Sequence, residues 1–164
     1  MTTTADPDLL AASGLLPRLQ AACPERLLWL APLPCPAPPP GATVTTLPLT
    51  EARAGLAALP RQSLAVLVDP LAALPRREAE ALLAALRDLH AEALLLLTPL
   101  QAAEGEGWTA ADLLALGLRQ VAATRHGGRD WRLCHFNLYD YKVTPDWFNP
   151  RFWAHPERWD KDWW

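Results

Sequence analysis

The sequence predicts an α/β domain with a mostly parallel sheet, helices on both faces and an antiparallel hairpin near the C-terminus. Short apolar runs of strand character alternate with segments of helical period, and strands joined by helices pair in parallel. The pair Gly127-Gly128 then separates two strand-like segments, as in a tight hairpin. Hydrophobic residues make up 51% of 164 residues, so residues 1–164 are expected to bury one core as a single domain.

The N-terminal segment predicts a helix followed by the first strand. Asp6-Pro7 is typical of an N-cap with proline at the first helical position, and we expect an interruption near Gly14 and Pro17. The run 27–31 is apolar and bounded by prolines, which indicates a buried strand. Residues 32–42 are rich in proline and predict a stiff, extended connector.

The middle of the chain predicts three strands and two helices. The strands are expected at residues 43–47, 64–68 and 93–97. Thr50 is expected to cap the first helix, which ends before Pro60, and residues 76–90 have the strongest helical period.

The last helix and the hairpin have defined boundary signals. Thr109 and Asp112 have the spacing of a capping box, and Gly117 is the expected left-handed stop of that helix. Residues 118–124 and 129–138 then form the predicted hairpin strands around Gly127-Gly128.

The last predicted strand has two different faces, because successive side chains alternate. One face is apolar and the other polar and aromatic: Cys134, Phe136 and Leu138 against His135, Asn137, Tyr139 and Tyr141. The second face suits either the lining of a pocket or a half-exposed edge strand. The same alternation separates the Cys134 thiol from the His135 ring, so the two cannot act as a nucleophile and base.

From about Leu64 to Leu138 the chain resembles the later half of a class I S-adenosylmethionine-dependent methyltransferase. The matching pieces are Ala65-Val-Leu-Val-Asp69-Pro, residues 76–90, Leu94-Leu-Leu-Leu-Thr98-Pro, residues 108–118 and the Gly127-Gly128 hairpin. The resemblance implies a Rossmann-like fold. That family has a glycine-rich loop after its first strand, whereas here the first strand runs into Pro32-Leu-Pro-Cys-Pro. After the second strand the family needs an acidic residue to hold the ribose of the cofactor, and here only Glu51 is near enough in the sequence. Prolines offer no N–H and crowd a ligand, so no cofactor is predicted.

Two residues are predicted to bind a ligand. Asp69 and Thr98 follow the strands at 64–68 and 93–97, and parallel sheets place functional groups where their strands end. The favoured alternative is that Asp69 only caps the turn from Pro70 to Pro75. No catalytic residue is predicted, since Ser13 and Ser63 lie outside any nucleophile motif. No metal site is predicted either, because the four histidines lack ligand spacing.

The C-terminal segment, residues 139–164, is rich in tryptophan and resembles the C-terminal signature of a family of short bacterial proteins of unknown function, which supports the expectation that the chain is a complete protein. Its five candidate partner-binding residues are Trp147, Trp153, Trp159, Trp163 and Trp164. The favoured interpretation is an irregular strap folded back on the domain, and the alternative is a surface that docks a protein partner. A swap onto a second copy, giving a homodimer, stays open as well.

Composition narrows the classes of function. The net charge is -3 without a basic block, which argues against nucleic acid as a partner. No apolar run is long enough to cross a membrane and no signal peptide is visible, so we expect a cytoplasmic bacterial protein with three buried, inert cysteines. The first hypothesis is a non-catalytic, methyltransferase-like binding or scaffolding module that uses its Trp-rich tail. The second is an S-adenosylmethionine-dependent methyltransferase or small-ligand-binding enzyme with a degenerate cofactor loop.

Overall fold

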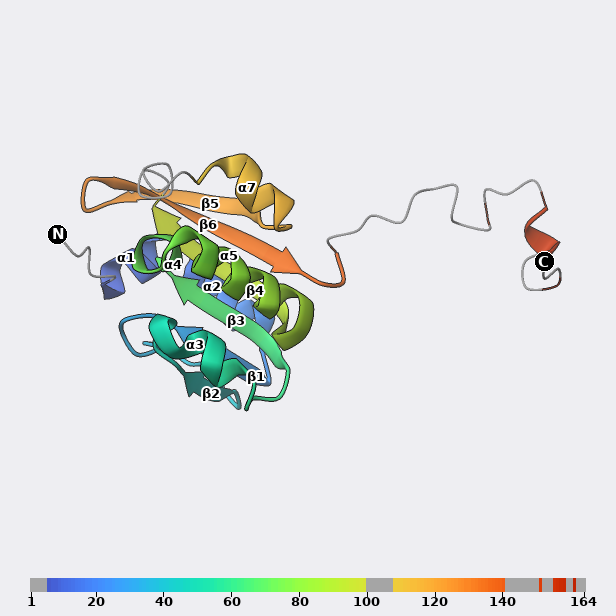
Figure 1. Ribbon diagram of the computed structural model, residues 1–164, viewed down its shortest axis with the longest axis horizontal. Helices are drawn as coiled ribbons and strands as arrows, with labels where there is room; N and C mark the ends of the chain where they lie inside the picture. The colour runs from blue at the N-terminus through green and yellow to red at the C-terminus, as the bar shows by residue number, and fades with distance from the viewer. Residues whose placement is uncertain (1–5, 100–107, 141–150, 152–154, 159–160, 162–164) are drawn as a thin grey trace.

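The structure is a computed structural model that describes residues 6–99, 108–140, 151, 155–158 and 161. Six strands form one sheet in the order β2-β1-β3-β4-β6-β5 (Figure 1). The strands are β1 (Arg26–Leu30), β2 (Thr43–Thr46), β3 (Gln62–Val68), β4 (Ala91–Pro99), β5 (Arg119–His126) and β6 (Arg129–Asn137). The helices are α1 (Pro7–Ala12), α2 (Leu15–Ala22), α3 (Leu49–Leu56), α4 (Pro70–Ala73), α5 (Arg76–Ala85), α7 (Ala110–Ala115), a π-helical turn η1 (Leu86–His90) and a 3-10 turn η4 (Pro156–Arg158).

The sheet has a parallel part and an antiparallel part. Strands β2, β1, β3 and β4 are parallel, whereas β6 is antiparallel to both β4 and β5. The second strand of the hairpin therefore lies inside the sheet and the first lies at its edge. The predicted α/β class and the predicted C-terminal hairpin are confirmed, and the interpretation of the last strand as an edge strand is wrong.

Helices cover both faces of the sheet, and each face has its own apolar cluster. Helices α3, α4, α5 and α7 pack on one face together with strand residues such as Leu28, Leu67 and Phe136. Helices α1 and α2 pack on the other face against Trp29, Val66 and others. Alternation along buried strands produces the two sets, so each strand contributes to both cores.

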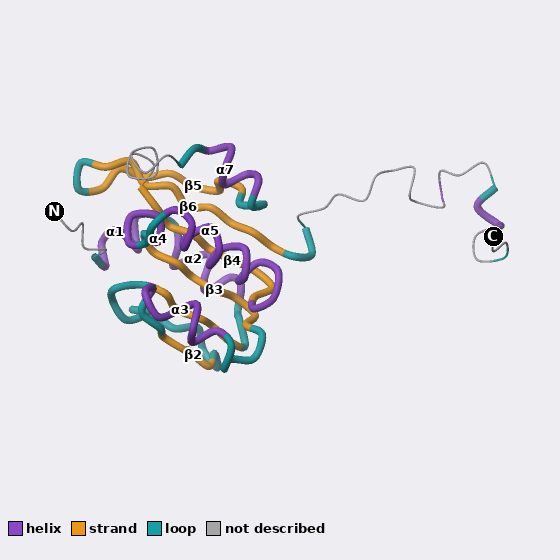
Figure 2. The backbone as a smooth tube through the Cα atoms, viewed as in Figure 1, coloured by secondary structure: helices purple, strands orange, loops and turns teal. Residues whose placement is uncertain are grey.

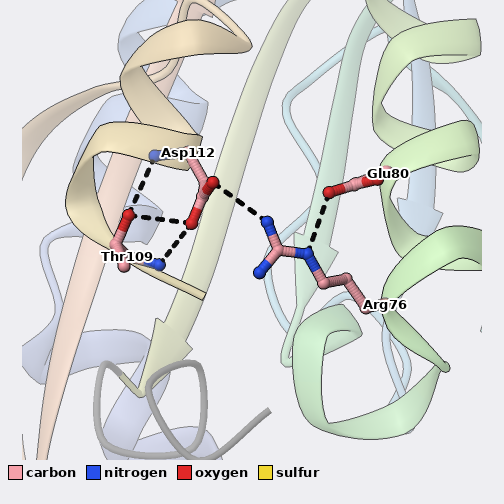
Figure 3. A network of polar contacts seen from close by, with 4 residues as sticks. All are labelled: Arg76, Glu80, Thr109 and Asp112. Carbon is pink, nitrogen blue, oxygen red and sulfur yellow. Dashed lines mark hydrogen bonds and ion pairs between the residues drawn. The ribbon is translucent and has the colours of Figure 1, made fainter. Parts of the chain in front are cut away.

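Several helix boundaries follow the predicted capping chemistry. The Asp6 carboxylate accepts a hydrogen bond of 2.7 Å from the Leu9 N–H at the start of α1. Thr109 and Asp112 form the predicted capping box at the start of α7, and Gly117 ends that helix with φ +80°. Arg76 on α5 donates to Asp112 as well, so the cap ties two helices together (Figure 3).

One boundary prediction was wrong and two were confirmed in part. Thr50 does not cap α3, because Leu49 already opens that helix after Pro48 and places Thr50 inside its first turn. The predicted interruption is present at Gly14, which separates α1 from α2, but Pro17 stands in the first turn of α2, where a missing N–H is tolerated. Residues 76–90 are helical as predicted, but the last five form a π-helical turn in which Leu89 is exposed.

The proline-rich connector joins β1 to β2 without a helix or strand of its own, as expected (Figure 2). Its chain is held by hydrogen bonds from two side chains. The Trp29 indole N–H donates to the Leu33 carbonyl at 2.6 Å, and the Gln20 amide donates to the Ala37 carbonyl at 2.8 Å. The connector is thus packed along the end of β1.

Candidate functional site

Asp69 and Thr98 lie together at the carboxyl edge of the parallel strands. The Asp69 N–H donates a hydrogen bond of 2.7 Å to the carbonyl of Leu97, the residue before Thr98. Asp69 has φ +55° and ψ +40°, a left-handed conformation that non-glycine residues adopt at a cost. The strand ends thus place both predicted ligand-binding residues on one edge, as the sequence pattern required.

The Asp69 carboxyl is poorly solvated. Burial raises its pKa to about 6, while the charge of Arg129 and the nearby backbone of Ala72 act in the opposite direction. One carboxyl oxygen, Oδ1, is buried and forms no hydrogen bond with the described residues, and the same holds for the hydroxyl of Thr98. The side chain of Asp69 does not cap α4. Instead the Asp69 carbonyl accepts from the Ala73 N–H at 3.2 Å, so the backbone closes the turn.

The residues at the end of β1 do not fit S-adenosylmethionine. Leu33 and Cys35 of the connector pack against the apolar cluster on the α1 and α2 face. The first glycine after β1 is Gly41, beyond the run of prolines, and Glu51 is exposed on α3. A cofactor phosphate or carboxylate seeks backbone N–H groups, and here prolines occupy the positions that would offer them.

A second candidate site lies at the opposite, amino edge of the parallel strands. A hollow of about 660 Å³ opens on the α2 face of the sheet, with residues from α2, β1, β3, β4 and β6 around it. The side chains that matter here are Arg18, Leu64, Leu95, His135, Asn137 and Tyr139. The polar face predicted for the last strand therefore lines a pocket, which is the first of the two interpretations it allowed.

The His135 ring is half-buried at this hollow. Burial lowers its pKa, and the charges of Arg18 and Arg119 lower it further, whereas Asp140 opposes them. The imidazole is therefore neutral at pH 7. Cys134, one residue earlier, faces the other cluster, where burial raises its thiol pKa to about 11.

The family model described as "Family of unknown function (DUF6231)" matches residues 8–164. The chain belongs to this family. None of the curated proteins matches the sequence.

Solved structures that resemble the DUF6231 chain include two rRNA methylases. An rRNA methylase from Escherichia coli shares 16% identity at a TM-score of 0.42, over 75% of this chain and 62% of that one. The 16S rRNA methylase RmtB shares 17% identity at a TM-score of 0.41, over 75% and 61%. The DUF6231 chain thus spans less than two thirds of either structure.

The predicted partner-binding residues fall outside the part of the DUF6231 chain that the structure describes. The residues concerned are Trp147, Trp153, Trp159, Trp163 and Trp164, together with Tyr141.

Within the described ranges, no group of three or more acidic, histidine or cysteine residues is placed to hold a metal ion. No helix in those ranges is long and apolar enough to span a bilayer. The expectation of three buried thiols is wrong, since Cys23 is exposed and Cys35 half-buried.

Sequence reasoning missed the part of the hollow contributed by α2. Arg18 gave no signal, because a lone arginine on a short helix is typical of a solvated surface. Its guanidinium donates to the Val121 carbonyl at 3.2 Å, across a sequence separation of 103 residues. Only the tertiary packing of α2 on the sheet brings Arg18 close to His135.

Proposed function

We propose that this DUF6231 protein is a non-catalytic binding module with a methyltransferase-like sheet, and that its Trp-rich C-terminal segment contacts a protein partner. The observation that carries the proposal is the connector after β1. The indole of the buried Trp29 fastens it through the Leu33 carbonyl, and its own apolar side chains pack on the core. A methyl donor would need a glycine-rich backbone at this place.

The order of elements supports the methyltransferase-like part of the proposal. Strand β3 ends in Asp69, helices and β4 follow, and α7 leads into a hairpin. The last strand, β6, is inserted between β4 and β5 and is antiparallel to both. The succession of elements along the chain is the one that the sequence resemblance implied for its later half, whereas the insertion of β6 between its neighbours was not predicted.

The composition of the C-terminal segment supports the proposal that it contacts a protein partner. Residues 147–164 contain five candidate tryptophans, and each large aromatic side chain buries roughly 150–250 Å² when it is covered. Tryptophan and arginine dominate the energetics of protein interfaces. Acidic and basic side chains balance in residues 151–164, which favours a protein over a nucleic acid as the partner.

Thermal unfolding with millimolar S-adenosylhomocysteine tests the loss of the cofactor site. We expect an unchanged midpoint for this protein, next to a methyltransferase that binds the compound as the positive control. A ligand at about a hundredfold excess over its dissociation constant adds roughly 2.7 kcal/mol of stability. A rise of several degrees would therefore contradict the proposal.

Co-purification tests the role of the tail. A full-length variant with Trp159, Trp163 and Trp164 replaced by serine should lose a protein that the wild type retains. The matched control replaces Leu89 and Leu114, which are exposed apolar residues of the domain. If the tail variant unfolds at a lower temperature and the control does not, the tryptophans belong to the core, and the partner proposal fails.

A second candidate function is favoured by the Asp69 carboxyl, whose pKa is raised to about 6 and whose Oδ1 lacks a hydrogen bond. Perturbed carboxyl groups at strand ends are typical of ligand or catalytic sites. A small-ligand-binding enzyme would use this edge. Thermal unfolding with adenosine tests it: stabilisation of the wild type that is absent in Asp69→Asn would favour the second candidate over the first.

A further inference from the structure

The hollow at the amino edge has a floor with two chemically different halves. Its floor consists of side chains from three neighbouring strands on the α2 face. Leu64 on β3 pairs with Ala93 on β4, which pairs with Asn137 on β6, while Leu95 pairs with His135 in the next row. The β3 and β4 half is therefore apolar and the β6 half is polar, with Arg18 of α2 beside it.

The polar half presents hydrogen-bond donors that the described residues leave unused. The Arg18 guanidinium gives one hydrogen bond to the Val121 carbonyl and none of its other N–H groups to a described residue. The Asn137 Oδ1 accepts from the Tyr139 N–H at 2.9 Å, which leaves the Nδ2 amide hydrogens without a partner in that part of the chain. The His135 ring likewise forms no hydrogen bond with the described residues. Three side chains thus offer donors to the hollow, Arg18, Asn137 and His135, and the Arg18 guanidinium can only donate.

Two acidic residues, Glu25 and Glu92, also line the hollow. Glu25 precedes Arg26 at the start of β1, and these two neighbours carry opposite charges. Glu92 precedes Ala93, so strand alternation directs its side chain toward the opposite face of the sheet. Neither contributes to the pKa shift of His135, whereas Arg18, Arg119 and Asp140 do.

We propose that the hollow between α2 and the β4–β6 pair binds a small organic carboxylate with a flat apolar body, of the aromatic monocarboxylate class. A carboxylate only accepts hydrogen bonds, which matches the donors of Arg18, Asn137 and His135. The apolar surface of Ala21, Ala22 and Ala93 lies next to them and takes the ring, above the buried Leu64 and Leu95. The volume of about 660 Å³ is within the usual range for small-molecule sites.

Small side chains give the site room for a flat ring. Ala21 and Ala22 of α2 stand along one side of the hollow and Ala93 stands in its floor. A larger residue at position 93 would fill the space above β4. The hollow lies at the amino edge of the parallel strands, opposite the Asp69 edge, and its proposed ligand involves none of the five candidate tryptophans, so this inference goes beyond the proposed function and does not depend on it.

The test uses the full-length protein and two isosteric probes, benzoate and benzamide, followed by calorimetry and by amide chemical shifts in NMR. We expect benzoate to bind at least about tenfold more tightly than benzamide, because charged acceptors form the stronger hydrogen bonds. Arg18→Met should weaken benzoate binding about tenfold. Arg26→Met, at the other end of the same hollow, is the matched control and should change it less than about twofold.

Ala93→Leu provides the steric test. It should abolish benzoate binding, and the shifts caused by benzoate in the wild type should centre on residues 93–95 and 135–137. Because Arg18 is exposed, the Arg18→Met variant is expected to fold even if Ala93→Leu does not. Its affinity for benzoate therefore tests the proposal in either case. Three results would overturn the proposal: no benzoate binding at millimolar concentration, equal affinity for benzamide, or binding unaffected by Arg18→Met.

Discussion

The guanidinium carbon of Arg76 lies 5.0 Å from the centre of the Trp108 ring. The same guanidinium contacts two carboxylates, with its Nε 3.0 Å from Glu80 on its own helix and its Nη2 3.0 Å from Asp112 on α7 (Figure 3). Arg76 therefore joins α5 to the start of α7, on either side of residues 100–107. A planar fork with several donors can make all three contacts at once.

Replacing Arg76 should lower the unfolding midpoint by a few degrees, in the order wild type, Arg76→Lys, Arg76→Met. Lysine keeps the charge but cannot reach both carboxylates and stack on the ring. Differential scanning calorimetry measures the midpoints. Arg77→Met is the control, since Arg77 is the exposed neighbour on the same helix. Equal midpoints for the Arg76 and Arg77 variants would show that this contact does not stabilise the fold.

Gly117→Ala should destabilise the protein by about 2 kcal/mol. Two costs combine at this position. The backbone is left-handed, with φ +80°, and a Cβ would meet the Phe136 ring at 3.1 Å. Gly128 also has a positive φ, +76°, but nothing lies within 4 Å of its Cβ position. Gly128→Ala should therefore cost only about 1 kcal/mol in urea unfolding, and equal losses would mean that the Phe136 ring moves freely aside.

Local rules were enough to predict most elements of this fold. The cap at Asp6, the capping box at Thr109 and the stop at Gly117 each follow from one residue type in one conformation. The failure at Thr50 has a physical reason as well. Pro48 is already the N-cap residue, so the helix begins at Leu49. Thr50 therefore lies inside the helix, where its hydroxyl cannot serve as the N-cap. A capping residue does not set the start of a helix where the backbone before it already has the conformation that begins the helix.

The candidate sites were predicted less completely, because they depend on pairing between distant segments. Alternation alone identified His135 and Asn137 as one polar face, which lines the hollow. It did not reveal that β6 lies between β4 and β5, since strand order is a long-range property. It gave no signal for Arg18, whose position beside His135 comes from the packing of α2.

The stability of the protein should depend on pH through Asp69. Its folded pKa, about 6, lies above the ordinary value of 3.8, so the folded state holds the proton more strongly between these values. Stability contributed by this group is complete below about pH 4 and is lost as the pH rises to about 6. Asp69→Asn keeps the shape and tolerates the left-handed backbone, and it should gain roughly 2 kcal/mol over wild type at pH 7, after allowance for solvent screening.

The two proteins should have equal stability near pH 4, where both side chains are neutral. Urea unfolding of wild type and Asp69→Asn across this range measures the difference, with Asp130→Asn as the control because Asp130 is exposed. A difference that does not change with pH would mean that the Asp69 carboxyl titrates at its ordinary value.

Trp29 and Trp131 are both wholly buried, and they differ in one respect. The Trp29 indole donates to the Leu33 carbonyl at 2.6 Å, whereas the Trp131 indole N–H has no hydrogen-bond partner in the part of the chain that the structure describes. Trp29→Phe should therefore cost about 1 kcal/mol more than Trp131→Phe, since both remove a similar volume but only the first leaves the half-buried Leu33 carbonyl without its donor.

The same pair of variants tests whether this hydrogen bond holds the proline-rich connector in place. Cys35 lies in the connector, where burial raises its thiol pKa and slows its alkylation. Trp29→Phe should speed the alkylation of Cys35 severalfold, while Trp131→Phe leaves it unchanged and the exposed Cys23 reacts alike in both. Mass spectrometry of the labelled peptides separates the two sites. If Cys35 reacts at the wild-type rate in Trp29→Phe, the apolar packing and the Gln20 hydrogen bond are enough to hold the connector, and the argument against a cofactor then depends on its prolines and not on the indole.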